Sequence, residues 1–132
     1  MKYILVATAL FYFGCTTLNT LFNVKIENKN LSLTSFGNST QEAPKNATLI
    51  LSDGTFTGFG GCNNFNGEFD INKYYIHFTI NNVGTKVCSQ TYKEGEYFKK
   101  LVNTTHLVIM GNKLLFKDKH EQTLLTFTKS EL

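Results

Sequence analysis

Three cysteines carry most of the reactive chemistry available to this chain: Cys15, Cys62 and Cys88. A cysteine side chain can act as a nucleophile, hold a soft metal ion or pair in a disulfide, and its surroundings decide which of these it does. Cys15 directly follows an apolar run and Gly14, whereas the other two cysteines lie well inside the sequence. We therefore expect Cys15 to differ in role from the other two.

The first 14 residues have the features of a secretory signal peptide. One lysine, Lys2, precedes an unbroken apolar run from Tyr3 to Phe13, which is shorter than the roughly 20 residues that span a bilayer. A cysteine at the end of such a run resembles a bacterial lipoprotein signal, in which this cysteine is acylated; an ordinary signal peptide cut nearby is the alternative. We predict a signal peptide over residues 1–14, lipidation at Cys15, and a lipid-anchored tether over residues 15–30 with a candidate edge strand at its end.

In an exported chain, the two remaining cysteines favour a disulfide between Cys62 and Cys88. Such a bridge contributes on the order of 3 kcal/mol, mainly by restricting the unfolded state. The alternative is a reactive thiol or a soft-metal pair, which needs a histidine or a cation nearby. The nearest histidine in the sequence, His77, falls on the polar face of a predicted strand, so the disulfide is the favoured interpretation.

Two carboxylates, Glu68 and Asp70, alternate along one predicted strand and would lie about 7 Å apart on the same face. Paired carboxylates at such spacing can serve as acid and base in glycoside hydrolysis. A solvated strand face with two charges explains them better, because the chain has no tryptophan to form a sugar platform. We favour the solvated face and predict that the protein is not an enzyme.

Histidines could also build a metal site. His77, His106 and His120 are the three in the chain, and Asp118 and Glu121 flank the last of them. A zinc site needs three or four ligands that converge at about 2 Å, and nothing local in the sequence supplies that set. We predict surface histidines, with no metal and no cofactor; a weak divalent-ion contact at the loop of Asp118, His120 and Glu121 is the alternative.

The composition excludes a nucleic-acid-binding role. The 132 residues carry a formal net charge of only +3, and every basic residue is a lysine. Arginine, the preferred ligand of phosphates and base edges, is absent. With 42% hydrophobic residues, the chain can form one domain with a buried core.

The remaining sequence alternates with a period of two, which is typical of half-buried antiparallel strands. The clearest case is Phe65, Gly67, Phe69 and Ile71, which share one face. Turn residues separate the runs, as at Ser52-Asp53-Gly54 and Gly111-Asn112. The predicted strands cover Leu31–Phe36, Ala47–Leu51, Thr55–Phe59, Phe65–Ile71, Lys73–Ile80, His106–Met110, Lys113–Phe116 and Thr123–Thr128.

One segment predicts a helix instead. Thr91 and Glu94 have the spacing of a capping box, and an apolar stripe of helical period follows them. The stripe consists of Tyr97, Phe98, Leu101 and Val102. Together these elements predict an α+β fold, in which a curved, barrel-like antiparallel β-sheet has one α-helix packed against it.

These pieces resemble the META domain family, which includes the bacterial HslJ lipoproteins. Gly61-Cys62-Asn63 with Gly67 is similar to the family's GCN…G segment, and Thr85 to Cys88 is similar to its second, cysteine-containing motif. Glu94 and Phe98 match a helix that carries an acidic and an aromatic residue. In this chain we interpret the first segment as a strand-to-strand corner, where glycines permit unusual φ values and Asn63 and Asn64 adopt left-handed or locally bonded conformations.

The resemblance implies a META-like domain over residues 31–132 and no established catalytic activity. It also implies a role in envelope stress tolerance or, in some members, virulence. We accordingly expect a monomeric lipoprotein of the bacterial cell envelope, periplasm-facing or associated with the outer membrane, with another envelope protein as its candidate partner. The alternative is a lipocalin-like carrier of a small hydrophobic ligand, although a small barrel tends to be filled by its own side chains.

Overall fold

The computed structural model describes residues 27–37, 42–72, 75–89 and 91–130. The predicted signal peptide, Cys15 and most of the predicted tether therefore lie outside the described residues. At the start of the described part, Glu27 forms an isolated parallel bridge with Leu51, and its carboxylate accepts a hydrogen bond of 2.9 Å from the backbone of Asp53. Across these ranges, no helix has the length and apolar character needed to cross a membrane.

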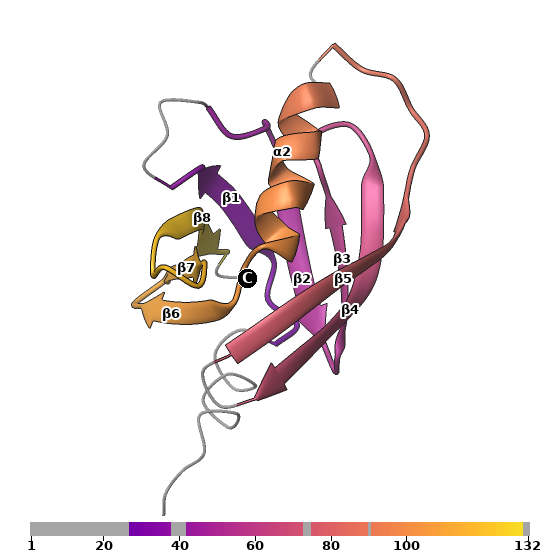
Figure 1. The fold of residues 1–132 in the computed structure, drawn as a ribbon. Coiled ribbons are helices and arrows are strands. Elements are labelled where there is room, and N and C mark those ends of the chain that lie inside the picture. The colour runs from indigo at the N-terminus through magenta and orange to yellow at the C-terminus, as the bar shows by residue number, and fades with distance from the viewer. Residues whose placement is uncertain (1–26, 38–41, 73–74, 90, 131–132) are drawn as a thin grey trace, which may run out of the picture.

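Eight antiparallel strands form the body of the protein, and their order is closed because the first strand pairs with the last (Figure 1). Each strand pairs with its neighbour in sequence, and the connection between the fifth and sixth strands contains a helix. This arrangement agrees with the predicted curved, barrel-like sheet. The strands are β1 (Leu31–Ser35), β2 (Thr48–Ser52), β3 (Thr55–Phe59), β4 (Asn64–Asn72), β5 (Tyr75–Val83), β6 (His106–Met110), β7 (Lys113–Lys117) and β8 (Thr123–Lys129).

Two tight turns are formed as the sequence predicts. Asp53 and Gly54 join β2 to β3 with φ values of 47° and 77°, and Gly111 begins the turn between β6 and β7 with a φ of 61°. Positive φ at these positions gives a two-residue turn the twist that matches the flanking strands. The Asp-Gly and Gly-Asn pairs therefore fix where these hairpins reverse.

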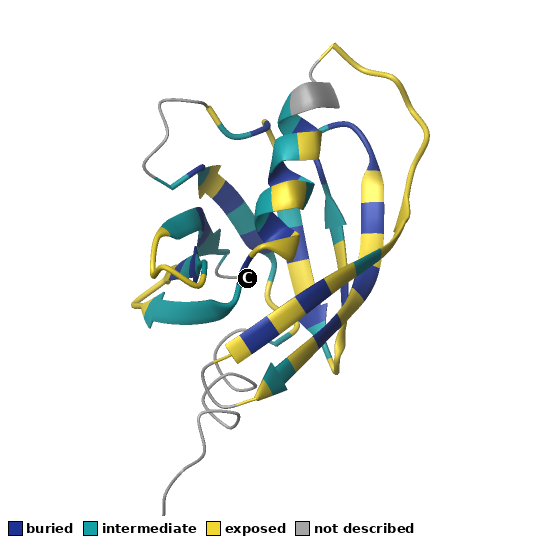
Figure 2. Ribbon diagram, in the orientation of Figure 1, coloured by how far each residue is buried: buried dark blue, intermediate teal, exposed yellow. Residues whose placement is uncertain are grey.

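The long hairpin of β4 and β5 shows the alternation most clearly (Figure 2). Phe65, Gly67 and Phe69 of β4 and Ile76 and Phe78 of β5 are buried, while the residues that alternate with them are exposed. The pairing shifts by one residue between Asn66 and Gly67 of β4, where β5 contains one extra residue, Asn81. A bulge of this kind increases the local twist and helps a sheet to curve.

The helix of the described residues, α2, spans Thr91–Val102 and packs against β5 and β8. The predicted apolar stripe is wrong at one end, because the Val102 side chain is 40% exposed. Glu94 takes part in the buried face instead, at 3% exposure, together with Tyr97 and Leu101. The face that meets the barrel therefore contains a carboxylate, and this carboxylate needs polar partners inside the protein.

Aromatic side chains fill the interior of the barrel. Six of them form a closed cycle in which neighbouring ring centroids are 4.7 to 6.1 Å apart. One member, Tyr97, comes from α2, and its hydroxyl donates a hydrogen bond of 3.1 Å to the Thr48 carbonyl of β2. Aromatic pairs at this separation add about 0.5–1.5 kcal/mol each beyond the area they bury. The cycle consists of Phe56, Phe65, Tyr97, Phe127, Phe116 and Phe78.

Candidate functional site

The corner between β3 and β4 is made by residues 60–63, as the sequence predicts. Gly61 has a φ of 103°, a conformation that disfavours any residue with a side chain, and the Gly60 N–H donates a hydrogen bond of 2.8 Å to the Asn63 carbonyl. Cys62 and Asn63 are 6% and 4% exposed, so this part of the corner is buried in the protein and does not project into solvent. Its buried backbone N–H groups need acceptors.

Glu94 of α2 supplies these acceptors. Its Oε2 accepts hydrogen bonds from the backbone N–H groups of Cys62 at 3.0 Å and Asn63 at 2.6 Å. Its Oε1 accepts a third hydrogen bond of 2.9 Å from the Asn63 side-chain amide. A buried carboxylate that accepts three hydrogen bonds is well compensated for its loss of water. The helix is thereby tied to the corner.

Asn63 also binds a third segment, the loop between β5 and α2. Its Oδ1 accepts a hydrogen bond of 2.8 Å from the Lys86 backbone N–H, and its Nδ2 donates one of 3.0 Å to the Lys86 carbonyl. One side chain thus holds both backbone groups of one residue in the loop between β5 and α2. We call the set of Gly60–Asn63, Lys86, Cys88 and Glu94 the clasp.

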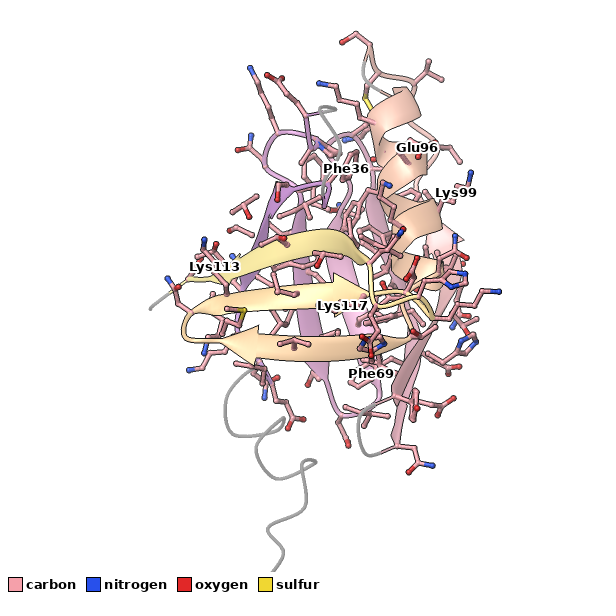
Figure 3. All side chains as sticks on the ribbon, turned by 60° about the vertical axis from the view of Figure 1, so that its left-hand side comes forward. Phe36, Phe69, Glu96, Lys99, Lys113 and Lys117 are labelled. Carbon is pink, nitrogen blue, oxygen red and sulfur yellow. A yellow bond between two sulfur atoms is a disulfide. The ribbon has the colours of Figure 1, made fainter. Side chains whose placement is uncertain are left out.

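The predicted disulfide between Cys62 and Cys88 is confirmed, with Cα atoms 6.0 Å apart. Cys62 is buried, whereas Cys88 lies in an exposed loop. Figure 3 shows the sulfur–sulfur bond beside the beginning of α2. The bridge therefore fastens the loop to the corner two residues after the Asn63–Lys86 hydrogen bonds do so.

Two glycines of this region are required by close approach. A Cβ atom on Gly60 would lie 2.5 Å from Oε2 of Glu94, and one on Gly67 would collide with the backbone oxygen of Thr79 and lie 2.6 Å from the Phe56 ring. Both distances are shorter than carbon atoms tolerate, so a side chain at either position would displace the clasp or the aromatic cycle. Gly67 of the family-like motif thus has a packing role.

One prediction about the clasp is wrong in its detail. Asn63 and Asn64 do not adopt positive φ, and the Asn63 side chain bonds to Lys86 and Glu94 rather than to its local backbone. The Glu94 carboxylate in turn accepts hydrogen bonds from the backbone of the corner. The reason is that the corner and the helix face each other, and their buried polar groups satisfy one another.

The other residues of the family-like motifs have simpler surroundings. Phe98 is half-buried and packs its ring 4.7 Å from that of Phe65 and 5.8 Å from that of Tyr97. Thr85 is exposed in the loop that carries Lys86. The neighbouring Tyr97 is fully buried, and desolvation raises the pKa of its hydroxyl well above the usual value.

Glu68 and Asp70 are exposed on the outer face of β4, opposite Thr79 and His77 of β5. This is the solvated strand face that the sequence analysis favours. In the loop after β7, Asp118 Oδ1 accepts backbone hydrogen bonds of 2.8 Å from His120 and 3.0 Å from Gln122.

Asp118 is the one carboxylate of the described residues with a resolved pKa shift. Desolvation alone would raise the pKa of Asp118. The opposing effects are larger, so the net shift is downward: the backbone N–H groups of Gln122 and His120 donate to the carboxylate, and the charges of His120 and His106 stabilise it. Within the described ranges, no group of three or more His, Cys, Asp or Glu side chains is placed to hold a metal ion.

An open depression of about 520 Å³ lies where β5 and β6 meet. Tyr75, which is 67% exposed, forms part of its wall together with His106, Val108, Lys119 and Glu121. These strands are joined by a single residue pair, Tyr75 with His106, so the sheet is at its weakest here. The depression lies on the outer surface, and the sequence analysis did not identify it.

The clasp holds backbone in place. Both carboxylate oxygens of Glu94 and both polar atoms of the Asn63 side chain are engaged in hydrogen bonds, and the two sulfur atoms are bonded to each other. The arrangement therefore fixes the relative positions of a corner, a helix and a loop. Sequence reasoning found the two cysteines but not the link through Asn63 and Glu94, whose only local signal is a carboxylate beside the apolar stripe of α2.

Comparisons with known proteins agree with this fold. A family model described as META domain matches residues 19–131. An NMR structure of a protein from Burkholderia xenovorans has a TM-score of 0.67 at 20% identity, covering 99% of this chain and 97% of that one. A crystal structure of a DUF4847 family protein from Bacteroides vulgatus has a TM-score of 0.62 at 15% identity, covering 83% and 98%. At these identities the two structures show a shared fold only, and no curated protein sequence matches the chain.

Proposed function

The chain belongs to the META domain family, and from this premise we propose that it is a non-enzymatic lipoprotein of the bacterial cell envelope that acts through protein interaction. In this proposal Cys15 carries the lipid, and a monomeric domain faces the periplasm or is associated with the outer membrane. A role in stress tolerance would follow from the partner that the domain binds.

The observation that supports a binding role is the clasp. Its residues are those of the family-like motifs, and they use their hydrogen-bonding groups to order an exposed loop rather than to line a cleft. An ordered exposed loop on a rigid scaffold is a common way to present a recognition surface. Glu94 and Asn63 can support such a loop from the interior, because each of their side-chain polar groups has a hydrogen-bond partner.

The lipoprotein part is tested by the intact mass of the protein isolated from the membrane fraction of its own cells, with and without reductant. We expect a chain that begins at Cys15 and carries acyl groups, and a gain of about 2 Da when the Cys62–Cys88 bridge is reduced. The Cys15→Ser variant is the control, and it should leave the membrane fraction. An unacylated Cys15 in the wild-type protein would contradict the proposal.

The carrier of a small hydrophobic ligand is the second candidate. The depression beside Tyr75 favours it, whereas the aromatic cycle that fills the barrel interior favours the interaction module. Native mass spectrometry of the protein from its own cells separates the two. A ligand that copurifies in stoichiometric amount would support the carrier, and a bare chain would support the interaction module.

A further inference from the structure

The loop between β5 and α2 is exposed along its whole described length, from Gly84 to Ser89. Figure 2 shows it as an unbroken exposed stretch that arcs away from the end of β5. Val87, near its middle, is 94% exposed, which is more than any other large hydrophobic residue among those described. An aliphatic side chain in water contributes no burial energy to the fold, so the fold itself gives no reason for valine at this position.

The same loop is held at three points. The Gly84 N–H donates a hydrogen bond of 3.0 Å to the Asn64 carbonyl, Asn63 binds both backbone groups of Lys86, and Cys88 is bonded to Cys62. Val87 lies between the second and third of these points. Because its two neighbours are fixed to the buried corner, its side chain is presented outward on an ordered backbone.

Ordering a loop before binding lowers the entropy cost of forming a complex. The backbone here has no positive φ from Thr85 to Ser89 and belongs to no helix or sheet. It is free to lie along an active-site cleft as a substrate does, with one exposed side chain for the main specificity pocket. A valine side chain suits a small apolar pocket, such as that of elastase-type serine endopeptidases.

We propose that residues 84–89 form a substrate-like loop, which inserts Val87 into the specificity pocket of a serine endopeptidase and inhibits it. This inference names the partner class of the interaction module proposed above and rests on that part of the proposal. It does not depend on lipidation at Cys15. The structure selects Val87 over the exposed Lys86 because the Lys86 backbone is already bound to Asn63.

The clasp also explains how such a loop would resist cleavage. The endopeptidase serine oxygen attacks the Val87 carbonyl carbon and forms an ester, while the bond to the Cys88 nitrogen breaks and this nitrogen takes the serine's proton. Cys88 stays bonded to Cys62, and Lys86 stays bonded to Asn63, so the new amine remains beside the ester. Its attack on the ester re-forms the peptide bond and returns the proton to the serine, with no atom lost.

The test is an inhibition assay with the full-length chain in detergent, pancreatic elastase and a chromogenic peptide substrate. We expect saturable inhibition of elastase at micromolar or lower concentration of the chain, and none of trypsin, whose pocket requires a basic side chain. Val87→Asp should weaken the inhibition at least about 30-fold, as the loss of a central contact residue does. The matched control, Val102→Asp, changes an exposed valine on α2 and should leave the inhibition constant within about twofold.

Three outcomes would overturn the proposal: no inhibition of elastase, equal inhibition by the Val87→Asp variant, or rapid cleavage after Val87 with recovery of elastase activity. The last is read by mass spectrometry after reduction, which separates the two fragments. Because Val87 is almost fully exposed, its variant should keep the thermal stability of the wild type. None of these outcomes alters the acylation measured at Cys15, so the two proposals fail separately.

Discussion

Replacing Glu94 by glutamine removes the charge at the centre of the clasp while keeping the size of the side chain. The carboxylate accepts three hydrogen bonds at 2.6 to 3.0 Å and is 3% exposed. An amide offers one oxygen and one NH₂ group. If the oxygen accepts from the Cys62 and Asn63 backbone, the NH₂ group must face the NH₂ group of Asn63.

Asn63 has no cheap way to avoid this conflict. Turning its amide over would lose the 2.8 Å and 3.0 Å hydrogen bonds to Lys86. One unsatisfied buried donor costs about 1–3 kcal/mol, and the weaker neutral hydrogen bonds to the backbone cost about 1 kcal/mol more. The neutral amide of glutamine costs less to bury than the carboxylate of glutamate, which offsets part of this loss. We therefore expect Glu94→Gln to lower the free energy of unfolding by about 2–3 kcal/mol.

Urea unfolding measures this change, and thermal unfolding should show a midpoint lowered by roughly 8–12 °C for a chain of this size. The matched control is Glu96→Gln, two residues further along the same helix and only half-buried, with an expected change within about 0.5 kcal/mol. If Glu94→Gln is as stable as this control, the clasp does not hold the corner as we describe it.

Three further predictions concern the same fold. Gly60→Ala should lower the free energy of unfolding by about 2 kcal/mol, because its Cβ would lie 2.5 Å from Glu94 Oε2. Gly95→Ala, which has open space around it, should raise the free energy of unfolding by about 0.5–1 kcal/mol, and urea unfolding compares the two variants. The double variant Cys62→Ser/Cys88→Ser should lose about 3 kcal/mol, and reductant should destabilise the wild type equally but leave this variant unchanged. Because the pKa of Tyr97 is raised in the folded protein, its stabilising effect is present below pH 10 and is lost as the pH rises further. The free energy of unfolding of Tyr97→Phe should therefore decline less over this range than that of the wild type. An equal decline would contradict the burial of the hydroxyl.

Local features of the fold could be predicted from the sequence because their causes are local. Asp53-Gly54 sets the turn between β2 and β3, and the alternation around Phe69 and Phe78 sets the buried face of the long hairpin. The pairing of β1 with β8, which closes the sheet, joins the two ends of the domain and leaves no local signal. The strand predicted over Lys73–Ile80 continues to Val83, where polar residues extend the pairing with β4 without adding to the apolar pattern.

In the candidate site, the corner at residues 60–63 and the disulfide were predictable from the sequence. Counting cysteines was enough to predict the Cys62–Cys88 pair, because the sequence analysis assigned Cys15 to a lipid and left only these two. The role of Glu94 depends on the corner lying opposite the helix, and helical periodicity carries no information about that neighbour. For the same reason Val102 was assigned to the buried face, although its side chain is 40% exposed.

Asn63 and Glu94 together hold the exposed loop in one conformation. Amide hydrogen exchange at Lys86 in the wild-type protein is a direct probe of this hold, because Lys86 is exposed while its N–H donates a 2.8 Å hydrogen bond to Asn63. We predict that the Lys86 amide exchanges about as slowly as the buried amides of Cys62 and Asn63, since opening the clasp exposes all three together. Exchange at Lys86 as fast as at neighbouring Val87, with Cys62 and Asn63 still protected, would contradict the claim.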